Sequence, residues 1–276
     1  MRFARYGAPG AERPAMVDAA GQLRDLSGVI PDLAGDVLAA LPQINPEGLP
    51  LVPGTPRLGP PVGHVGKFIG IGLNYADHAA EAGMTPPAEP IVFMKATSSI
   101  IGPDDPVSLP RESQKADWEI ELGVIIGRAA KYVSPDNALD HVAGYTIVND
   151  LSERAFQIER GGQWTKGKSC DSFGPIGPWL VTPDEVGDPQ TLDLALDLNG
   201  QKAQRGNTGS MIFGVAQIIS YLSQMMSLRP GDVIATGTPP GVGMGMTPQR
   251  FLVEGDQMSL RIDGLGAQRQ IVKRDV

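Results

Sequence analysis

The stretch "KADWEIELGVIIG", residues 115–127, places two acidic residues directly before an apolar run. Glu119 and Glu121 alternate with the large apolar residues from Trp118 to Leu122, and this period of two predicts a β-strand. In a strand the two glutamates share one face, with Cα atoms about 7 Å apart at a rise of ~3.3 Å per residue. The segment therefore predicts a strand with one core face and one acidic face.

The composition favours a β-rich fold and excludes several classes of partner. The 276 residues include 35 glycines and 25 prolines, which suit many turns and short strands. A net charge of -8 argues against nucleic acid and against an anionic membrane surface. No apolar run approaches the ~20 residues of a membrane span, and residues 1–10 lack the apolar core of a secretory signal. A single cysteine allows no internal disulfide, so we expect a cytoplasmic location.

Apolar and alternating runs predict a series of strands after residue 60. They cover "KFIGIGL" (67–73), "PIVFMK" (90–95), "GYTIVND" (144–150), "DVIATG" (232–237) and "QMSLRIDG" (257–264). The segment "LDLALDLNG" ends in Asn199-Gly200, a pair typical of a tight hairpin turn. One long helix is predicted within residues 210–226, where apolar residues recur at helical spacing. Few helices and many non-local strands indicate an α+β fold that is β-rich.

Seven prolines between residues 42 and 61 predict a stiff, extended connector. Upstream of it, short strands are expected in residues 2–6 and on either side of a turn at Gly21, and a short helix ending at Pro42. We therefore expect a small N-terminal domain with its connector over residues 1–60, and a larger catalytic domain over residues 61–276.

A third acid supports a metal site beside the two glutamates. Asp150 ends the strand predicted after theirs, and like charges held this close repel unless a cation lies between them. Three oxygen ligands favour Mg²⁺, or Mn²⁺ or Ca²⁺, over zinc, and leave about three octahedral positions for substrate and water. The alternative is a solvated polar face of an antiparallel sheet.

Six segments in order resemble the motif series of the fumarylacetoacetate hydrolase family. They are "GIGLNYADHAAEAG", "PIVFMKATSSIIGP", "DWEIELGVIIG", "VAGYTIVNDLSERAFQ", "GKSCDSFGPIGPWLVT" and "GDVIATGTPPGVGMG", within residues 67–272. The resemblance implies a mixed β-roll of the fumarylacetoacetase C-terminal type, a homodimer, and a divalent cation at Glu119, Glu121 and Asp150. Residues 1–60 resemble the small appended domain of bacterial members. "QWTKGKSCDSFGP" with "TPPGVGMGM" resembles the branch that hydrolyses 2,4-diketo-3-deoxy sugar acids, which is often named ureidoglycolate lyase.

The resemblance implies that His78 and Glu81 activate a water molecule. Three residues apart on a short helix, the two side chains can touch, and a histidine is suited to take a proton near neutral pH. The alternative is an ion pair on the surface.

The resemblance also implies substrate contacts, at Arg154, Gln157 and Thr238. Lys168 is expected to bind the substrate and stabilise an enolate, with Lys166 as a close rival, and Lys95 is a further candidate for the same pocket. Cys170 has no base partner nearby and is expected to be a small buried residue. "TGTPPGVGMG" lacks the ending of a phosphate-binding loop, so we expect its backbone amides to donate at the edge of the site.

Together these features predict an enzyme that cleaves an acylpyruvate to pyruvate and a carboxylic acid, with a small keto acid as its partner. Oxaloacetate decarboxylation is the leading alternative, because it needs the same enolate but no attacking water. Isomerase, hydratase or ureidoglycolate lyase activity is a further alternative on the same scaffold. A carboxylate-binding protein without enzymatic activity is the hypothesis from a different class.

Overall fold

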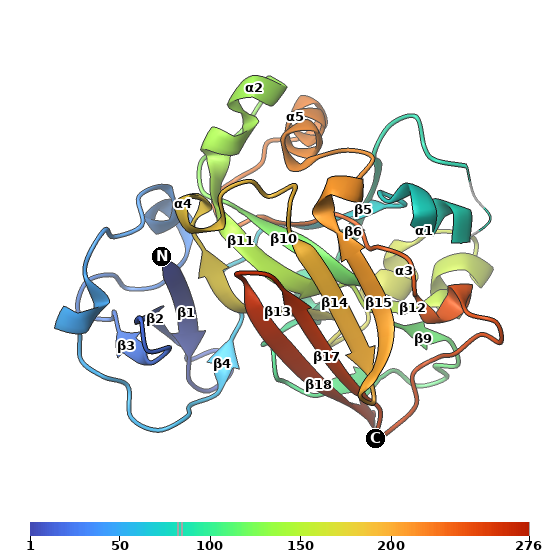
Figure 1. Cartoon of the computed structure of the whole chain (residues 1–276), viewed down its shortest axis with the longest axis horizontal. Coiled ribbons are helices and arrows are strands. Elements are labelled where there is room, and N and C mark those ends of the chain that lie inside the picture. Colours follow the sequence, from blue (N-terminus) through green and yellow to red (C-terminus); the bar gives the residue numbers. More distant parts are fainter. Residues whose placement is uncertain (82, 84, 276) are drawn as a thin grey trace.

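The computed structural model describes residues 1–81, 83 and 85–275, and within them 11 strands form one mixed sheet (Figure 1). In spatial order its main path is β3 (Leu23–Asp25), β2 (Arg13–Val17), β1 (Arg2–Tyr6), β13 (Gly174–Val181), β11 (Val142–Asn149), β10 (Ile120–Ile126), β16 (Val233–Ala235), β5 (Phe68–Gly72) and β6 (Ile91–Lys95). Two short strands join it from the side, β4 (Leu58–Gly59) on β1 and β7 (Ile100–Ile101) on β13. The pairs β5–β16 and β7–β13 are parallel and the other pairs are antiparallel.

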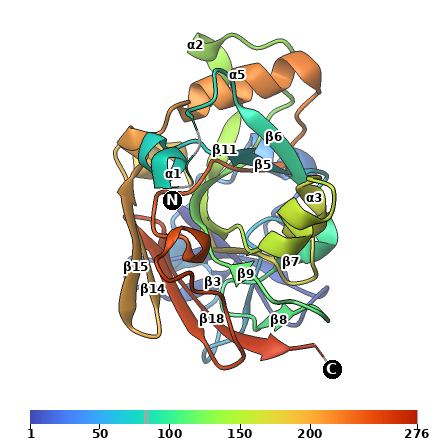
Figure 2. The same cartoon turned by 90° about the vertical axis from the view of Figure 1, so that its right-hand side faces the viewer.

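A second sheet packs against the first. It holds β15 (Gln201–Asn207), β14 (Asp193–Leu198), β17 (Gln257–Ile262), β18 (Gly266–Arg274) and β8 (Val107–Leu109), while β9 (Ala116–Asp117) pairs with β12 (Ser152–Glu153). The α-helices are α1 (Ala76–Glu81), α2 (Pro135–Ala138), α3 (Thr165–Lys168), α4 (Pro183–Val186) and α5 (Val215–Met225). Short 3₁₀ turns are η1 (Gly35–Ala39), η2 (Pro46–Gly48), η3 (Thr97–Ser99), η4 (Leu139–His141), η6 (Thr208–Ser210) and η7 (Gly243–Gly245), and η5 (Ala155–Glu159) is a π-helix. In Figure 2, α2 and α5 lie together at one end of the molecule, and β14, β15 and β18 lie toward the other. No helix in the described part of the chain is long and apolar enough to cross a membrane.

The predicted β-rich α+β fold is confirmed. Each strand predicted after residue 60 is present, the Asn199-Gly200 turn joins β14 to β15, and the predicted long helix is α5. The short helix expected before Pro42 is the 3₁₀ turn η1. Strand β13 was not predicted, since its sequence "GPIGPWLV" has the composition of a loop.

The N-terminal strands share a sheet and a core with the rest of the chain. Strand β1 pairs with β13, with Phe3 opposite Leu180. Phe3 and Met16 belong to the same buried cluster as Phe68 and Val233. That residues 1–60 form a domain of their own stays a prediction.

Both faces of strand β10 are buried, which explains why its sequence is mostly apolar. The side chains of Ile120 and Leu122 belong to the main core cluster, and that of Ile125 to the second cluster. Glu119 and Glu121 share the face of Ile125, on the other side of Gly123. One end of this face is therefore apolar core, and the other end carries the acidic residues.

Candidate active site

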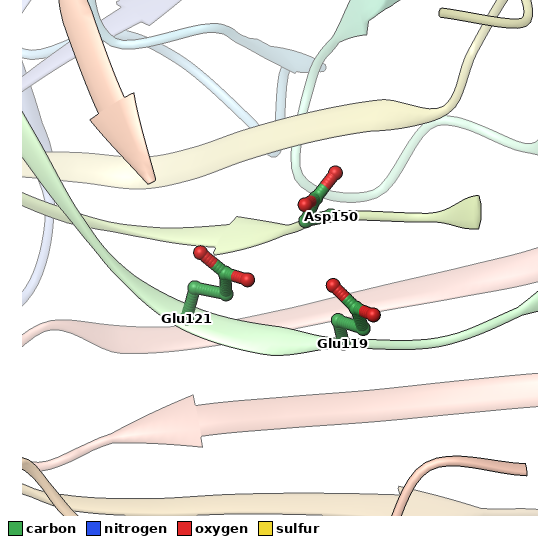
Figure 3. A group of neighbouring side chains, drawn as sticks. All are labelled: Glu119, Glu121 and Asp150. Carbon is green, nitrogen blue, oxygen red and sulfur yellow. The ribbon is translucent and has the colours of Figure 1, made fainter. Parts of the chain in front are cut away.

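Three carboxylates converge where β10 and β11 lie side by side. Glu119, Glu121 and Asp150 are buried, and each offers an oxygen within 4.8 Å of the other two. Asp150 follows the last residue of β11, and its backbone amide donates to the carbonyl of Glu119 across 2.9 Å. Figure 3 shows Glu121 and Glu119 along one stretch of chain, β10 and the residue directly before it, with Asp150 beside them at the end of the neighbouring strand. The strand pairing thus fixes the three side chains, as the sequence spacing predicted.

Three buried cations surround these acids. Lys168 Nζ lies 2.6 Å from Glu119 Oε2 and 2.7 Å from Asp150 Oδ2. Arg154 Nη2 lies 2.7 Å from Glu119 Oε1, and Lys95 Nζ lies 2.6 Å from Asp150 Oδ1. Burial alone would lower the pKa of Lys168, but the charges of Asp150 and Glu119 outweigh it and raise that pKa. Lys168 is therefore a permanent positive charge in the site.

The two glutamates differ in their electrostatic surroundings. Burial opposes ionisation of Glu119, but the charges of Lys168 and Arg154 outweigh it and lower its pKa to about 2. Burial, followed by the charges of Asp150 and Glu119, raises the pKa of Glu121 well above its usual range. The amide of Gly237 donates to Glu121 Oε2 across 2.7 Å, and no ion pair to Glu121 forms within the described residues. Glu121 thus lacks the positive charge that a bound cation would supply.

The donor set fits a divalent cation. Asp150 Oδ1 is buried with Lys95 Nζ 2.6 Å away, and a carboxylate oxygen has two lone pairs, so one of them remains for a ligand. The buried cations Lys95, Arg154 and Lys168 pair with Asp117, Glu119 and Asp150, and within the described residues none of them forms an ion pair with Glu121. Carboxylate oxygens are the ligands that hard cations prefer. Glu119, Glu121 and Asp150 would hold the ion.

The predicted pair of His78 and Glu81 is present in α1. Nδ1 of the buried His78 lies 3.3 Å from Glu81 Oε2, which leaves Nε2 for a ligand. The amide of Gly241 donates to both oxygens of Glu81, at 3.0 and 3.1 Å. Burial would raise the pKa of Glu81, but its hydrogen bonds with His78 and Gly241 outweigh burial and lower it. Glu81 is therefore an ionised partner that orients the imidazole.

Asp117 is a structural centre of the site that the sequence reasoning missed. Its carboxylate accepts hydrogen bonds from the amides of Gly243 and Met244, at 2.7 and 3.0 Å, and from Arg154 Nε at 2.9 Å. The signal was present, because Asp117 continues the period of two that joins Glu119 and Glu121. The loop after β16 was expected to donate amides at the edge of the site. Its donors at Gly237, Gly241 and Gly243 bind the protein's own carboxylates.

The predicted substrate-binding residues fall into two groups. Gln157 and Thr238 line the same pocket as the glutamates, with Arg154. Gln157 Oε1 accepts from Arg154 Nη1 across 3.1 Å, and the Thr238 hydroxyl donates to the Ile120 carbonyl across 2.8 Å. Lys95 does not line this pocket; its ammonium donates to the carbonyls of Leu151 and Lys168 and pairs with Asp150.

The structure separates the two candidate lysines of α3. Lys168 lines the pocket, whereas the exposed Lys166 donates to the carbonyl of Arg160 across 2.6 Å. Cys170 is partly buried, and burial raises the pKa of its thiol to about 11. A thiol with that pKa stays protonated near neutral pH, in line with the expectation that Cys170 is not a nucleophile.

Comparison with known proteins adds independent findings. A family model described as "Fumarylacetoacetate (FAA) hydrolase C-terminal" matches residues 67–273. The Burkholderia cenocepacia protein "Putative hydrolase BceJ2315_61450" is 63% identical over 276 residues, covering 98% of each chain. The structure is similar to that of a fumarylacetoacetate hydrolase from Exiguobacterium antarcticum, with a TM-score of 0.89, 36% identity and 100% of each chain covered. It is also similar to a 2-hydroxyhepta-2,4-diene-1,7-dioate isomerase from Mycobacterium marinum, with a TM-score of 0.78, 33% identity, and 100% of this chain and 99% of that chain covered.

Proposed function

The chain belongs to the fumarylacetoacetate hydrolase family, and from that premise we propose that it hydrolyses an acylpyruvate with the help of a divalent cation. The bond cleaved is C3–C4 of a 2,4-diketo acid, which gives pyruvate and a carboxylic acid. One observation carries the proposal: the acidic cluster with Lys168 and the pair of His78 and Glu81 line or adjoin a single pocket.

The charges of the site support an anionic substrate and a doubly charged cation. Lys168 and Arg154 line the pocket as buried cations, and a bound divalent ion would add further positive charge beside them. A carboxylate substrate is attracted to such a site because buried charges interact strongly at low dielectric. We propose Mg²⁺ as the ion, with Mn²⁺ or Ca²⁺ as alternatives of the same ligand preference.

The reaction requires a base, a stabilised enolate and a proton donor. His78, oriented by Glu81, takes a proton from water, and the resulting hydroxide adds to the C4 carbonyl carbon. The C3–C4 bond then breaks and its electron pair moves to C3, while the C4 fragment leaves as a carboxylic acid. Lys168 stabilises the negative charge of the pyruvate enolate, and the proton from His78 completes the methyl group at C3. When bound, the divalent cation supplies Lewis-acid stabilisation of the charge that develops on the keto oxygen.

Arg154, Gln157 and Thr238 are proposed to orient the substrate. Arg154 is held by Asp117 and Glu119, so its guanidinium has one fixed direction, and the Gln157 side chain keeps its amide N–H groups for a ligand. Lys95 is proposed to act on the substrate only through Asp150 and Lys168. We further propose that the enzyme is a cytoplasmic homodimer.

Two other reactions draw on the same groups. Decarboxylation of oxaloacetate is proposed as the leading alternative, because it needs the enolate stabilisation around Lys168 but no base. The likeness to an isomerase from Mycobacterium marinum supports isomerisation as another alternative. Hydratase and ureidoglycolate lyase chemistry stay alternatives that rest on the family resemblance alone.

A panel assay tests the proposal. Pyruvate release is measured from acylpyruvates, 2,4-diketo-3-deoxy sugar acids and oxaloacetate, each with Mg²⁺ and with EDTA. We expect turnover of a diketo acid that EDTA abolishes and Mg²⁺ restores. Full turnover in a metal-free sample would contradict the metal site. Tight binding of keto acids without turnover under any condition would indicate a carboxylate-binding protein instead.

A further inference from the structure

We infer that the acyl group of the substrate is apolar, an alkyl or aryl group and not a polyhydroxylated chain; this inference rests on the proposed function. The pocket over the carboxylates has an apolar wall, formed among the described residues by Ile71, Leu73, Phe93, Ile158, Trp164 and Met244. The resemblance to a sugar-acid branch implied a hydroxylated acyl group, and the composition of this wall points the other way.

The apolar wall begins next to the charged end of the pocket. Lys168 Nζ lies 4.9 Å from the centre of the Phe93 ring, and the Phe93 and Trp164 rings are 5.6 Å apart at an interplanar angle of 57°. A substrate whose reacting end lies beside Lys168 therefore has the Phe93 ring, and the Trp164 ring that packs near it, in the same pocket. Aromatic side chains of this kind offer large apolar surfaces with few degrees of freedom.

The backbone holds this wall in place. A methyl group added at Gly72 would lie 2.3 Å from Cζ3 of Trp164, so the indole packs directly on the β5 backbone. Thr165 Oγ1 donates to the Met94 carbonyl across 2.9 Å and ties α3 to β6. These contacts hold the Trp164 ring against the β5 backbone and fix α3 beside β6.

The mouth of the pocket is apolar as well. Ile158 lines the pocket and yet is 49% exposed, one of the few large apolar side chains left open to water in the described structure. An apolar acyl group that covers Ile158 removes this surface from water, which favours binding.

Several polar side chains of the pocket already have hydrogen-bond or ion-pair partners within the protein. The Thr238 hydroxyl donates to the Ile120 carbonyl and accepts from Gln204 Nε2 across 2.8 Å. Lys168 and Arg154 are bound to the acids of the site. Within the described residues the pocket groups left without a hydrogen-bond or ion-pair partner are few: the Gln157 amide nitrogen, the Trp164 indole N–H and His78 Nε2, which the proposed mechanism assigns to water. A polyol would therefore bury more hydroxyl groups than the pocket can pair. Such an apolar pocket disfavours an added hydroxyl by up to about 10²-fold.

A matched pair of substrates tests the inference. With Mg²⁺ present, kcat/KM is measured for 2,4-dioxohexanoate and for its 5,6-dihydroxy counterpart, which have the same carbon chain. We expect the alkyl substrate to be preferred by roughly 10-fold or more, within the range for a hydroxyl in an apolar pocket. Equal values, or preference for the dihydroxy substrate, would overturn the inference and leave the proposed hydrolase intact.

A matched pair of variants tests whether Ile158 contributes to the preference for the alkyl substrate. Ile158→Gln should reduce the ratio of kcat/KM for the alkyl substrate to kcat/KM for the dihydroxy substrate by roughly 5-fold, because it places an amide at the apolar mouth of the pocket. Val253→Gln is the control, because Val253 is 50% exposed and lies outside the pocket lining. If this ratio of kcat/KM values were the same in Ile158→Gln as in Val253→Gln, the apolar wall would not be what selects the acyl group.

Binding of uncleavable ligands separates this inference from the proposed function. Calorimetry with 2-oxohexanoate and 5,6-dihydroxy-2-oxohexanoate, which lack the C4 ketone, reports affinity without turnover. Tighter binding of the alkyl acid by roughly 10-fold is expected even if no diketo acid is hydrolysed. Equal or weaker binding of the alkyl acid would overturn the inference, whatever the enzyme does with diketo acids.

Discussion

Replacing Asp117 with Asn should weaken the contacts that position Arg154 and the loop at Gly243, while the carboxylates of Glu119, Glu121 and Asp150 remain in the site. The substitution keeps the size of the side chain but removes its charge and exchanges one acceptor oxygen for a donor. Asp117 accepts from the Gly243 and Met244 amides and from Arg154, so at least one of these donors loses its partner. Arg154 keeps its contacts with Glu119 and Gln157, which limits the damage.

The expected loss of stability follows from these contacts. Removing one partner of a buried ion pair costs about 3–5 kcal/mol, and the remaining contacts of Arg154 place the cost near the lower end, about 3 kcal/mol. At about 2.1 cal/mol/K per residue, a chain of this length has an unfolding entropy near 0.58 kcal/mol/K, so Tm should fall by about 5 °C. Because Arg154 and Met244 line the pocket, KM should rise by about 10-fold or more, with a smaller change in kcat.

Asp256→Asn is the matched control. Asp256 is also buried, pairs with Arg250 at 2.7 Å and accepts from the Val253 amide at 2.8 Å, but it does not line the pocket. Thermal unfolding and steady-state kinetics are measured for both variants. Both should lose several degrees in Tm, and only Asp117→Asn should change KM. An unchanged KM in Asp117→Asn, or an equal rise in both variants, would refute the role assigned to Asp117.

Three further predictions concern the ion, the base and the assembly. Mg²⁺ at 100 times its dissociation constant should stabilise the protein by about 2.7 kcal/mol, which is about 5 °C in Tm, and EDTA should reverse the shift. Glu119→Gln should require far more Mg²⁺ for the same shift, and an unchanged Mg²⁺ titration would show that Glu119 is not a ligand. His78→Ala should reduce acylpyruvate hydrolysis by about 10²- to 10⁴-fold and any oxaloacetate decarboxylation much less; equal losses would mean that His78 positions the substrate. Sedimentation at micromolar concentration should show a homodimer, and a monomer would contradict the assembly proposed from the family.

Much of the site could be predicted because strand alternation is a local rule. The period of two in "DWEIEL" places its acids on one face, and the end of the next predicted strand supplies Asp150. Asp117 obeys the same rule, but a lone acid at the start of a strand has the appearance of a solvated residue. Its partners in the Gly243 loop are more than a hundred residues away, and only the folded chain brings them together.

Other features depend on contacts that the sequence does not encode locally. The choice between Lys166 and Lys168 depends on how the four-residue helix α3 packs, which composition cannot show. Strand β13 carries Pro175 and Pro178, which normally argue against a central strand. Pro178 lies where the register between β11 and β13 shifts, and Pro175 lies opposite Ile101 of the short strand β7, which only the partner strands reveal.

The pairing of β1 with β13 also bears on how the protein is made. Phe3 faces Leu180, so β1 leaves the ribosome long before its partner strand exists. At about 5–20 residues per second, synthesis of the roughly 170 residues between them takes about 9 to 34 s. During this time the edge of β1 at Arg2 and Phe3 is unpaired on the nascent chain, because β4 pairs only with Arg5 and Tyr6, and such edges recruit other strands. The first strand is therefore paired with β2 and β4 alone until β13 has been synthesised, and only then is it joined to the rest of the sheet.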